Sequence, residues 1–195
     1  MKPIENELEQ RSMLSKDKYF EIVSNVFFLE EKYQSFDITN RYFDDDSLSL
    51  YHHKIVLRSR EIKDEIVLTL KLTKEDGSSI EVSQEINNFQ HQMLINNFEL
   101  PKGIVKLKLH ELQVDYSKVR YKGMNKVRRI EVHHGDSLIC IDKMNLGEIE
   151  EYNIEVESSS MGKASEILKD LSKKYSFEIT KDYLSKAYRT LKNGD

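Results

Sequence analysis

Residues 54–73 read KIVLRSREIKDEIVLTLKLT, and this stretch decides the fold class. It consists of two runs rich in apolar and β-branched residues around a short polar turn, which is the pattern of a β-hairpin. Because alternate residues of a strand share a face, Arg58 and Arg60 project together, and Thr69 and Lys71 do the same on the second run. The stretch therefore predicts two antiparallel strands with one apolar face and one face that carries cations.

The rest of the chain continues this pattern of short strands at hairpin spacing. Outside the hairpin, strands are expected at Ile4–Ser12, Phe36–Asp44, Ser79–Ile86, Lys126–His133, Ser137–Asp142 and Asn153–Ser158. Helices are predicted at Ser15–Phe28, Gln90–Ile95, Lys163–Tyr175 and Lys181–Leu191. Ser47–His52 is expected to be a short helix or a turn, and Val105–Tyr121 fits either a helix or a strand. We therefore expect an α+β, mainly β fold: a closed antiparallel eight-stranded β-barrel with peripheral helices.

Composition limits the classes of partner. The 195 residues favour a single domain spanning 1–195, and a net charge of −4 gives no overall attraction to nucleic acid or to anionic membranes. No sequence-specific nucleic-acid partner and no membrane partner are expected. Cys140 is the only cysteine, so no internal disulfide forms, and the acidic start with Glu5, Glu7 and Glu9 does not fit a signal peptide. A cytoplasmic protein is expected.

Charged residues gather on one face of several predicted strands. Further sets that share a face are Glu7, Glu9 and Arg11; Glu81, Ser83 and Glu85; Arg129 and Glu131; and Glu155 and Glu157. The common arrangement of such alternation leaves the charges in solvent over an apolar core. The alternative packs the apolar faces against the helices and turns the charges into the barrel. Two of these strands carry two carboxylates each on one face, and another carries two arginines. This grouping of like charges is unusual for a solvent-facing surface, so it supports the alternative.

A charged interior of this kind suits a metal ion and a polyphosphate. Glu7, Glu9, Glu155 and Glu157 supply carboxylate oxygens for Mg²⁺ or Mn²⁺, which prefer oxygen ligands and share their shell with phosphates. Guanidinium and ammonium groups bind phosphate oxygens, and the set on these faces is Arg11, Arg58, Arg60, Lys71 and Arg129.

The segment Glu7-Leu8-Glu9-Gln10-Arg11 resembles the E-x-E-x-K motif of the triphosphate tunnel metalloenzymes, or CYTH domains. Other segments are similar to family motifs in the same order: Tyr42-Phe43-Asp44, Leu57-Arg58-Ser59-Arg60, Leu68-Thr69-Leu70-Lys71, Arg129-Ile130-Glu131, Asp142, Tyr152-Asn153-Ile154-Glu155-Val156-Glu157 and Ser185-Lys186. The pattern is most similar to the short CYTH proteins of Gram-positive bacteria. Arg11 departs from it, because the signature has lysine there, and this puts rate and substrate preference in question.

The resemblance implies a role for each matching residue. Glu7, Glu9 and Arg11 would be catalytic, and Glu7, Glu9, Glu155 and Glu157 would bind the metal. The triphosphate would be bound by Arg11, Arg58, Arg60, Lys71, Arg129 and Lys186. Glu81, Glu85 and Asp142 form a second set, either linked to the metal or paired with basic residues. The family also suggests a homodimer.

Three functions fit this set of residues. The first is metal-dependent hydrolysis of inorganic triphosphate or a small organic triphosphate, in which water attacks the terminal phosphoryl group. The second is an adenylyl cyclase that makes cyclic AMP from ATP, ranked lower because no adenine-reading set of residues stands out. The third is a nucleotide or polyphosphate-binding module without turnover, which Arg11 keeps open.

Overall fold

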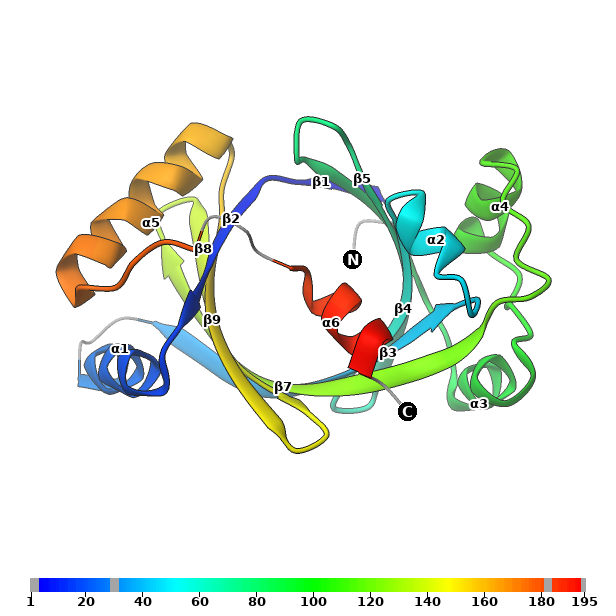
Figure 1. Ribbon diagram of the computed structural model, residues 1–195, viewed down its shortest axis with the longest axis horizontal. Coiled ribbons are helices and arrows are strands. Elements are labelled where there is room, and N and C mark those ends of the chain that lie inside the picture. The colour runs from blue at the N-terminus through cyan, green and yellow to red at the C-terminus, as the bar shows by residue number, and fades with distance from the viewer. Residues whose placement is uncertain (1–3, 29–31, 181–183, 194–195) are drawn as a thin grey trace. The chain divides into compact units, whose positions relative to one another are not determined.

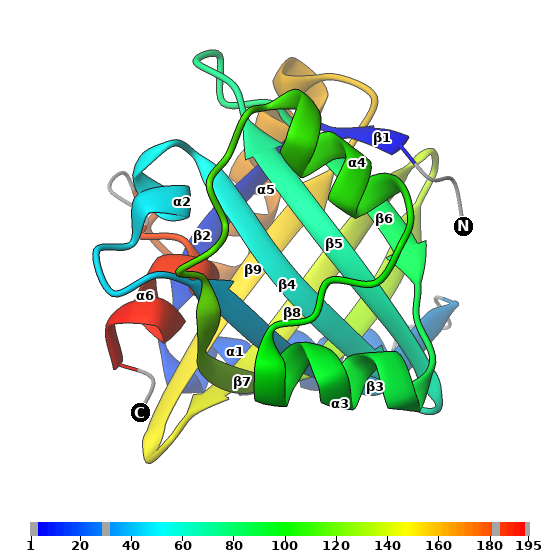
Figure 2. The same cartoon turned by 90° about the vertical axis from the view of Figure 1, so that its right-hand side faces the viewer.

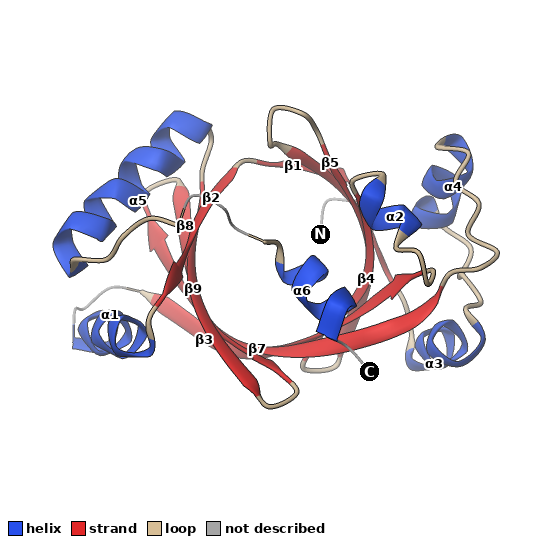
Figure 3. Cartoon of the chain, viewed as in Figure 1, coloured by secondary structure: helices blue, strands red, loops and turns tan. Residues whose placement is uncertain are grey.

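The computed structural model describes residues 4–28, 32–180 and 184–193, and the side chains of Glu7, residues 26–28 and residue 193 lie outside the description. The fold is mainly β with several helices (Figures 1 and 3). The strands are β1 (Ile4–Glu7), β2 (Glu9–Leu14), β3 (Tyr33–Asp44), β4 (Ile55–Ile62), β5 (Glu65–Thr73), β6 (Ser79–Glu85), β7 (Arg120–His134), β8 (Ser137–Leu146) and β9 (Ile149–Glu157). The helices are α1 (Lys16–Phe28), α2 (Ser49–His52), α3 (Asn88–Asn97), α4 (Ile104–Glu111), α5 (Met161–Tyr175) and α6 (Lys186–Asn193).

The described strands form a nine-stranded sheet in the order β1-β6-β5-β4-β3-β7-β8-β9-β2. The expected eight strands are corrected to nine, because the single strand predicted at Ile4–Ser12 is two strands separated by Leu8. The halves pair with different partners, β1 with β6 and β2 with β9. The order has β1 and β2 at its ends, so among the described residues the hydrogen bonds form an open sheet, and the expected closed barrel is corrected on this point.

The chain divides into two compact units, which are interleaved in sequence. The first unit comprises residues 1–6, 38–125 and 185–195, and the second comprises 7–37 and 126–184. The boundaries cut β3 after Asp37 and β7 after Asn125, so each of these strands contributes residues to both units. The expectation of one domain over 1–195 stays a prediction.

In the first unit, α3 and α4 cover one face of the sheet formed by β4, β5 and β6 (Figure 2). The sheet contributes Leu57, Leu68 and Leu70 to the core, each at most 1% exposed. The helices contribute Leu94 and Leu109, which are fully buried. The apolar face of the hairpin at 54–73 therefore packs against helices, as the second interpretation of the alternation required.

The second unit repeats this arrangement with other elements. Here α1 and α5 pack on the sheet formed by β7, β8, β9 and β2, and α5 contacts β2 and β9. Ile141, Ile154 and Val156 point from the strands into the core, where they meet Ile22 of α1 and Leu168 of α5. Ser160 caps α5 by accepting a hydrogen bond from the backbone N–H of Lys163, which explains where this helix begins.

Two segments differ from the expectations at their boundaries. The ambiguous segment Val105–Tyr121 is a helix, α4, followed by a loop and the start of β7. Of the helix predicted at Lys181–Leu191, residues 181–183 lie outside the described residues, and α6 begins at Lys186.

None of the helices, over the residues described, is both long and apolar enough to cross a membrane.

Candidate active site

The polar face of the first unit is the side of β4, β5 and β6 that α3 and α4 leave uncovered. It carries Arg58, Arg60, Thr69, Lys71, Glu81, Ser83 and Glu85, because these residues alternate with the core residues along each strand. Strand register places Lys71 opposite Glu81, and Arg58 opposite Thr69. The hairpin thus brings its predicted phosphate-binding cations onto one surface.

Glu81 holds two of these cations. Its Oε1 accepts a hydrogen bond from Arg58 Nη2 at 3.0 Å and lies 3.6 Å from Lys71 Nζ. The side chains are only 12–18% exposed, so both contacts are stronger than surface ion pairs. Among the alternatives for Glu81, the geometry supports pairing with basic residues. Glu85 is exposed at the end of β6.

The C-terminal helix α6 packs beside this face within the first unit. Ala187 and Leu191 of α6 are buried against Tyr42 of β3, the strand residue opposite Arg58. Asn125 Nδ2 donates to Thr190 Oγ1 at 2.8 Å, which ties the helix to β7. Lys186, at the start of α6, is therefore on an element fixed next to the cations of β4.

The polar face of the second unit is the side of β7, β8, β9 and β2 opposite α1 and α5. Its described members are Glu9, Arg11, Arg129, Glu131, Cys140, Asp142, Asn153, Glu155 and Glu157. Register arranges them in rows across the strands: Arg129 with Asp142 and Asn153; Glu131 with Cys140, Glu155 and Arg11; and Glu157 with Glu9. The side chain of Glu7, predicted to belong here, lies outside the described residues.

Arg129 is the centre of a buried ion-pair network on this face. Its Nε and Nη2 donate to the two carboxylate oxygens of Asp142 at 2.8 Å each, and Nη2 also donates to Glu155 at 2.8 Å. The side chains of Arg129, Glu155 and Asp142 are 8%, 6% and 0% exposed. Burial opposes the charged guanidinium, but the two carboxylates outweigh it and raise the pKa of Arg129 well above its ordinary value.

Arg11, which replaces the signature lysine, links two of the predicted metal ligands. It donates to Glu9 Oε1, and its Nη1 lies 3.8 Å from Glu155 Oε1. A second carboxylate, Glu157, lies directly across from Glu9 in the register of β2 and β9. Three of the four predicted metal ligands therefore share one face, and arginine contacts two of them.

The oxygen donors of this face fit a hard divalent cation in kind. Glu9, Glu155 and Glu157 offer carboxylates, and the buried amide of Asn153 beside them has no hydrogen-bond partner. No group of three or more His, Cys, Asp or Glu is arranged around a common metal position among the residues that the structure describes, which do not include the side chain of Glu7. The donor set is present, and ligation requires the carboxylates to turn from arginine to the metal.

Other polar residues were not anticipated as parts of these faces. Asn153 is two residues before Glu155, so extending the alternation of β9 by one step would have found it. Cys140 is buried on the same face, and burial raises the pKa of its thiol well above the ordinary value, which leaves it an unreactive structural residue.

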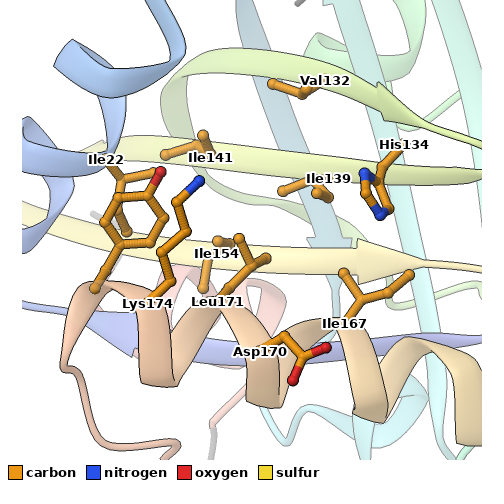
Figure 4. A pocket seen from close by; sticks show the side chains of 11 residues that line it. Ile22, Val132, His134, Ile139, Ile141, Ile154, Ile167, Asp170, Leu171 and Lys174 are labelled. Atoms are coloured by element: carbon orange, nitrogen blue, oxygen red, sulfur yellow. The ribbon is translucent and has the colours of Figure 1, made fainter. Parts of the chain in front are cut away.

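A cavity of about 260 Å³ lies on the opposite, helix-covered side of the second unit (Figure 4). Its walls are core residues such as Ile22, Ile154 and Leu171, and Asp170 and Lys174 stand at its edge. None of the predicted site residues with a described side chain lines it. The charged faces, and not this cavity, are therefore the candidate site.

Comparisons with known proteins agree with the motif resemblance. The family model of the CYTH domain matches residues 5–188. "Putative triphosphatase YjbK" of Bacillus subtilis strain 168 is 30% identical over 172 residues, which is 88% of this chain and 87% of that protein. Among solved structures, a "putative adenylate cyclase" from Bacillus halodurans is similar with a TM-score of 0.86 at 24% identity, over 96% of this chain and 98% of that one.

A second solved structure has a similar fold at lower identity. It is the "putative adenylyl cyclase HpAC1" from Hippeastrum, described as having a dominant triphosphatase activity, with a TM-score of 0.75 at 18% identity over 96% of this chain and 94% of that one. Likeness at this level concerns the fold. The family model and the Bacillus subtilis relative together cover most of the sequence, and the chain belongs to the CYTH domain family.

Proposed function

We propose that this protein is a metal-dependent triphosphatase that hydrolyses inorganic triphosphate or a small organic triphosphate. The observation that carries the proposal is the separation of charge between two polar faces. The first unit presents Arg58, Arg60 and Lys71, which suit phosphate oxygens. The second presents Glu9, Glu155 and Glu157, which suit Mg²⁺ or Mn²⁺.

The proposed roles follow from the chemistry of each face. A divalent cation held by the carboxylates would offset negative charge on the phosphate oxygens. Arg58 and Lys71 bind phosphate oxygens, and Glu81 keeps their charged ends at a fixed spacing. Lys186 and Arg129 belong to the same proposed phosphate-binding set. Glu9, together with Glu7, orients the water that attacks the terminal phosphoryl group, and Arg11 holds Glu9 in position.

The names of related proteins support the same reaction. YjbK carries the name "putative triphosphatase", and the Hippeastrum protein is described by a dominant triphosphatase activity. The Bacillus halodurans structure carries the name "putative adenylate cyclase", which keeps cyclic AMP formation as the second candidate. Both reactions begin from a triphosphate, so a single assay that measures both products separates them.

The test is a phosphate-release panel. Inorganic triphosphate, thiamine triphosphate and ATP are each incubated with the purified protein and Mg²⁺, Mn²⁺ or EDTA, and cyclic AMP is measured in the ATP samples. We expect metal-dependent phosphate release. Cyclic AMP without phosphate release would favour the cyclase. Binding of triphosphate without either product, together with activity in Arg11→Lys, would favour the binding module.

Variants of both faces complete the test. Glu9→Gln and Glu157→Gln keep the side-chain shape and remove a charged ligand, so kcat/KM should fall by about 100-fold or more. The kcat/KM of Lys71→Met should fall as well if the first unit binds the substrate. Glu148→Gln is the matched control, because Glu148 is exposed in the turn before β9. Rates in Glu9→Gln and Glu157→Gln equal to that of the control would refute the proposed metal site.

A further inference from the structure

Asn153 is a buried polar residue on the polar face of the second unit. It lies on β9, opposite Asp142 of β8 and Met13 of β2, and two residues before Glu155. Its exposed fraction is 0%. Strand alternation turns it away from Ile154 and the helix-covered core, toward the side that carries the carboxylates.

Among the residues that the structure describes, the amide of Asn153 has no hydrogen-bond partner. Both Oδ1 and Nδ2 are buried without one. Two asparagines of the first unit show the usual situation: Asn40 Nδ2 donates to Asn125 Oδ1 at 3.0 Å, and Asn125 Nδ2 donates to Thr190 at 2.8 Å. Because an unpaired buried amide lowers stability, its presence on this face points to a partner that is not part of the chain.

The charges around Asn153 indicate which part of the amide meets that ligand. The described residues of this face include five carboxylates and two guanidinium groups: Glu9, Glu131, Asp142, Glu155 and Glu157 against Arg11 and Arg129. Nε and Nη2 of Arg129 are hydrogen-bonded to Asp142 and Glu155. The local excess of negative charge favours a cation, and the atom of the amide that binds a hard cation is its oxygen.

We propose that Asn153 Oδ1 is an additional ligand of the divalent cation, next to Glu155 in the oxygen donor set. This inference rests on the proposed metal-dependent function, but it concerns a residue outside the motif that suggested that function. It accounts for two observations together: the position of a neutral amide among carboxylates, and the absence of any hydrogen-bond partner for it. The amide adds an oxygen ligand without adding charge to an acidic surface.

The test measures Mn²⁺ binding directly, without substrate. Mn²⁺ is titrated into the full-length protein and followed by electron paramagnetic resonance of the free ion and by calorimetry. Asn153→Leu has a similar volume and no oxygen, so the dissociation constant should rise about tenfold or more. Asn153→Asp keeps an oxygen, so it should bind Mn²⁺ at least as tightly as the parent. Asn145→Asp is the control, because Asn145 is exposed on the opposite face of β8.

Melting temperatures in EDTA distinguish ligation from a structural role. If the amide is unpaired in the metal-free protein, Asn153→Leu should melt at the same temperature as the parent or about 2–4 °C higher. Asn125→Leu should melt lower, because that amide has partners. Added Mn²⁺ should raise the melting temperature of the parent more than that of Asn153→Leu. Asn153→Ala serves if the leucine variant does not fold.

The outcomes separate this inference from the proposed function. If Glu9→Gln and Glu157→Gln lose Mn²⁺ binding but Asn153→Leu and Asn153→Ala keep it, Asn153 is not a ligand and the metal site stands. If Asn153→Asp weakens Mn²⁺ binding as much as leucine does, the N–H group is the functional part and the inference is wrong. If the parent binds no Mn²⁺, both the inference and the metal dependence fail.

Discussion

Removal of the Arg129 charge should unfold the protein at a much lower temperature. Arg129→Met keeps the length of the side chain and leaves the carboxylates of Asp142 and Glu155 without their hydrogen-bonded cation. These carboxylates are 0% and 6% exposed, so water cannot replace the arginine. Breaking a buried ion pair from one side costs about 3–5 kcal/mol. At about 2–4 °C per kcal/mol for a protein of this size, the melting temperature should fall by roughly 6–20 °C.

The neighbouring residue provides the matched control. Arg128 is on the same strand but faces the other way, its side chain is 51% exposed, and its partner Asp37 is 78% exposed. Arg128→Met should therefore change the free energy of unfolding by no more than about 0.5 kcal/mol. Thermal and urea unfolding, followed by circular dichroism, measures both variants against the parent.

Two further measurements follow from the cause of the instability. Without Arg129, burial favours the neutral forms of Asp142 and Glu155, so the variant should recover stability as the pH falls from 7 toward 5. Adding Asp142→Asn to Arg129→Met removes one buried negative charge and should restore part of the loss. If Arg129→Met is no less stable than Arg128→Met, the ion-pair network does not contribute as described.

His91 predicts a pH dependence of the first unit: burial lowers its pKa, with Arg41 acting in the same direction and Glu61 against it, and its Nε2 contacts Ser59 Oγ at 2.9 Å. Because the folded-state pKa of His91 lies below its unfolded-state pKa, its contribution to stability is full above about pH 6.5. Below that pH the free energy of unfolding falls, by at most about 1.4 kcal/mol per pH unit. Urea unfolding at pH 7 and pH 5 should show this loss in the parent and a smaller loss in His91→Gln. Gly103 has φ +150°, and a Cβ there would collide with the amide of Gln84, which accepts a hydrogen bond from the N–H of Val105 at the start of α4. Gly103→Ala should lower the unfolding free energy by about 1–3 kcal/mol, because this φ strains any residue with a Cβ and the Gln84 amide must move out of its hydrogen bond. Gly162→Ala, with open space around its Cβ position, should not; equal melting temperatures in the two variants would contradict this reasoning.

The composition of each polar face could be predicted because strand alternation is local. Arg58, Lys71, Glu155 and Glu157 alternate with apolar residues, and this alone places them opposite the core side chains. Which face of the sheet the helices cover depends on long-range packing. The grouping of charges by sign was the only sequence feature that favoured helices packed on the apolar face.

The break at Leu8 and the ion pairs could not be predicted in the same way. The break follows from a change of partner strand, from β6 for β1 to β9 for β2, which is a long-range property. Arg129 meets Asp142 because of the register of β7 and β8, and a shift of two residues would pair it differently. The sequence motifs identify Arg129, Asp142 and Glu155 as site residues. Only the structure shows that the guanidinium of Arg129 forms ion pairs with both carboxylates.

The segment that became α4 shows how two periodicities compete. Val105, Leu107 and Leu109 alternate as in a strand, but the structure buries Val105 and Leu109 and leaves Leu107 62% exposed. Burial at i and i+4 is the helical pattern. The side chain of Gln84, from β6, accepts the hydrogen bond of the Val105 N–H in the first turn. A residue 21 positions away in sequence thus helps to select the helix.

The opposite charges of the two polar faces restrict the ligand as a chemical species. The cations of the first unit, with Glu81 and Glu85 as their only carboxylates among the face residues described, suit an anion. The five carboxylates of the second unit outnumber its two arginines and repel a free triphosphate. A divalent cation alone suits the second face and not the first. A metal–triphosphate complex carries charges of both signs, and it is the ligand that the proposed function predicts. Under that proposal, the affinity for triphosphate should depend on the metal more steeply than the affinity for inorganic phosphate.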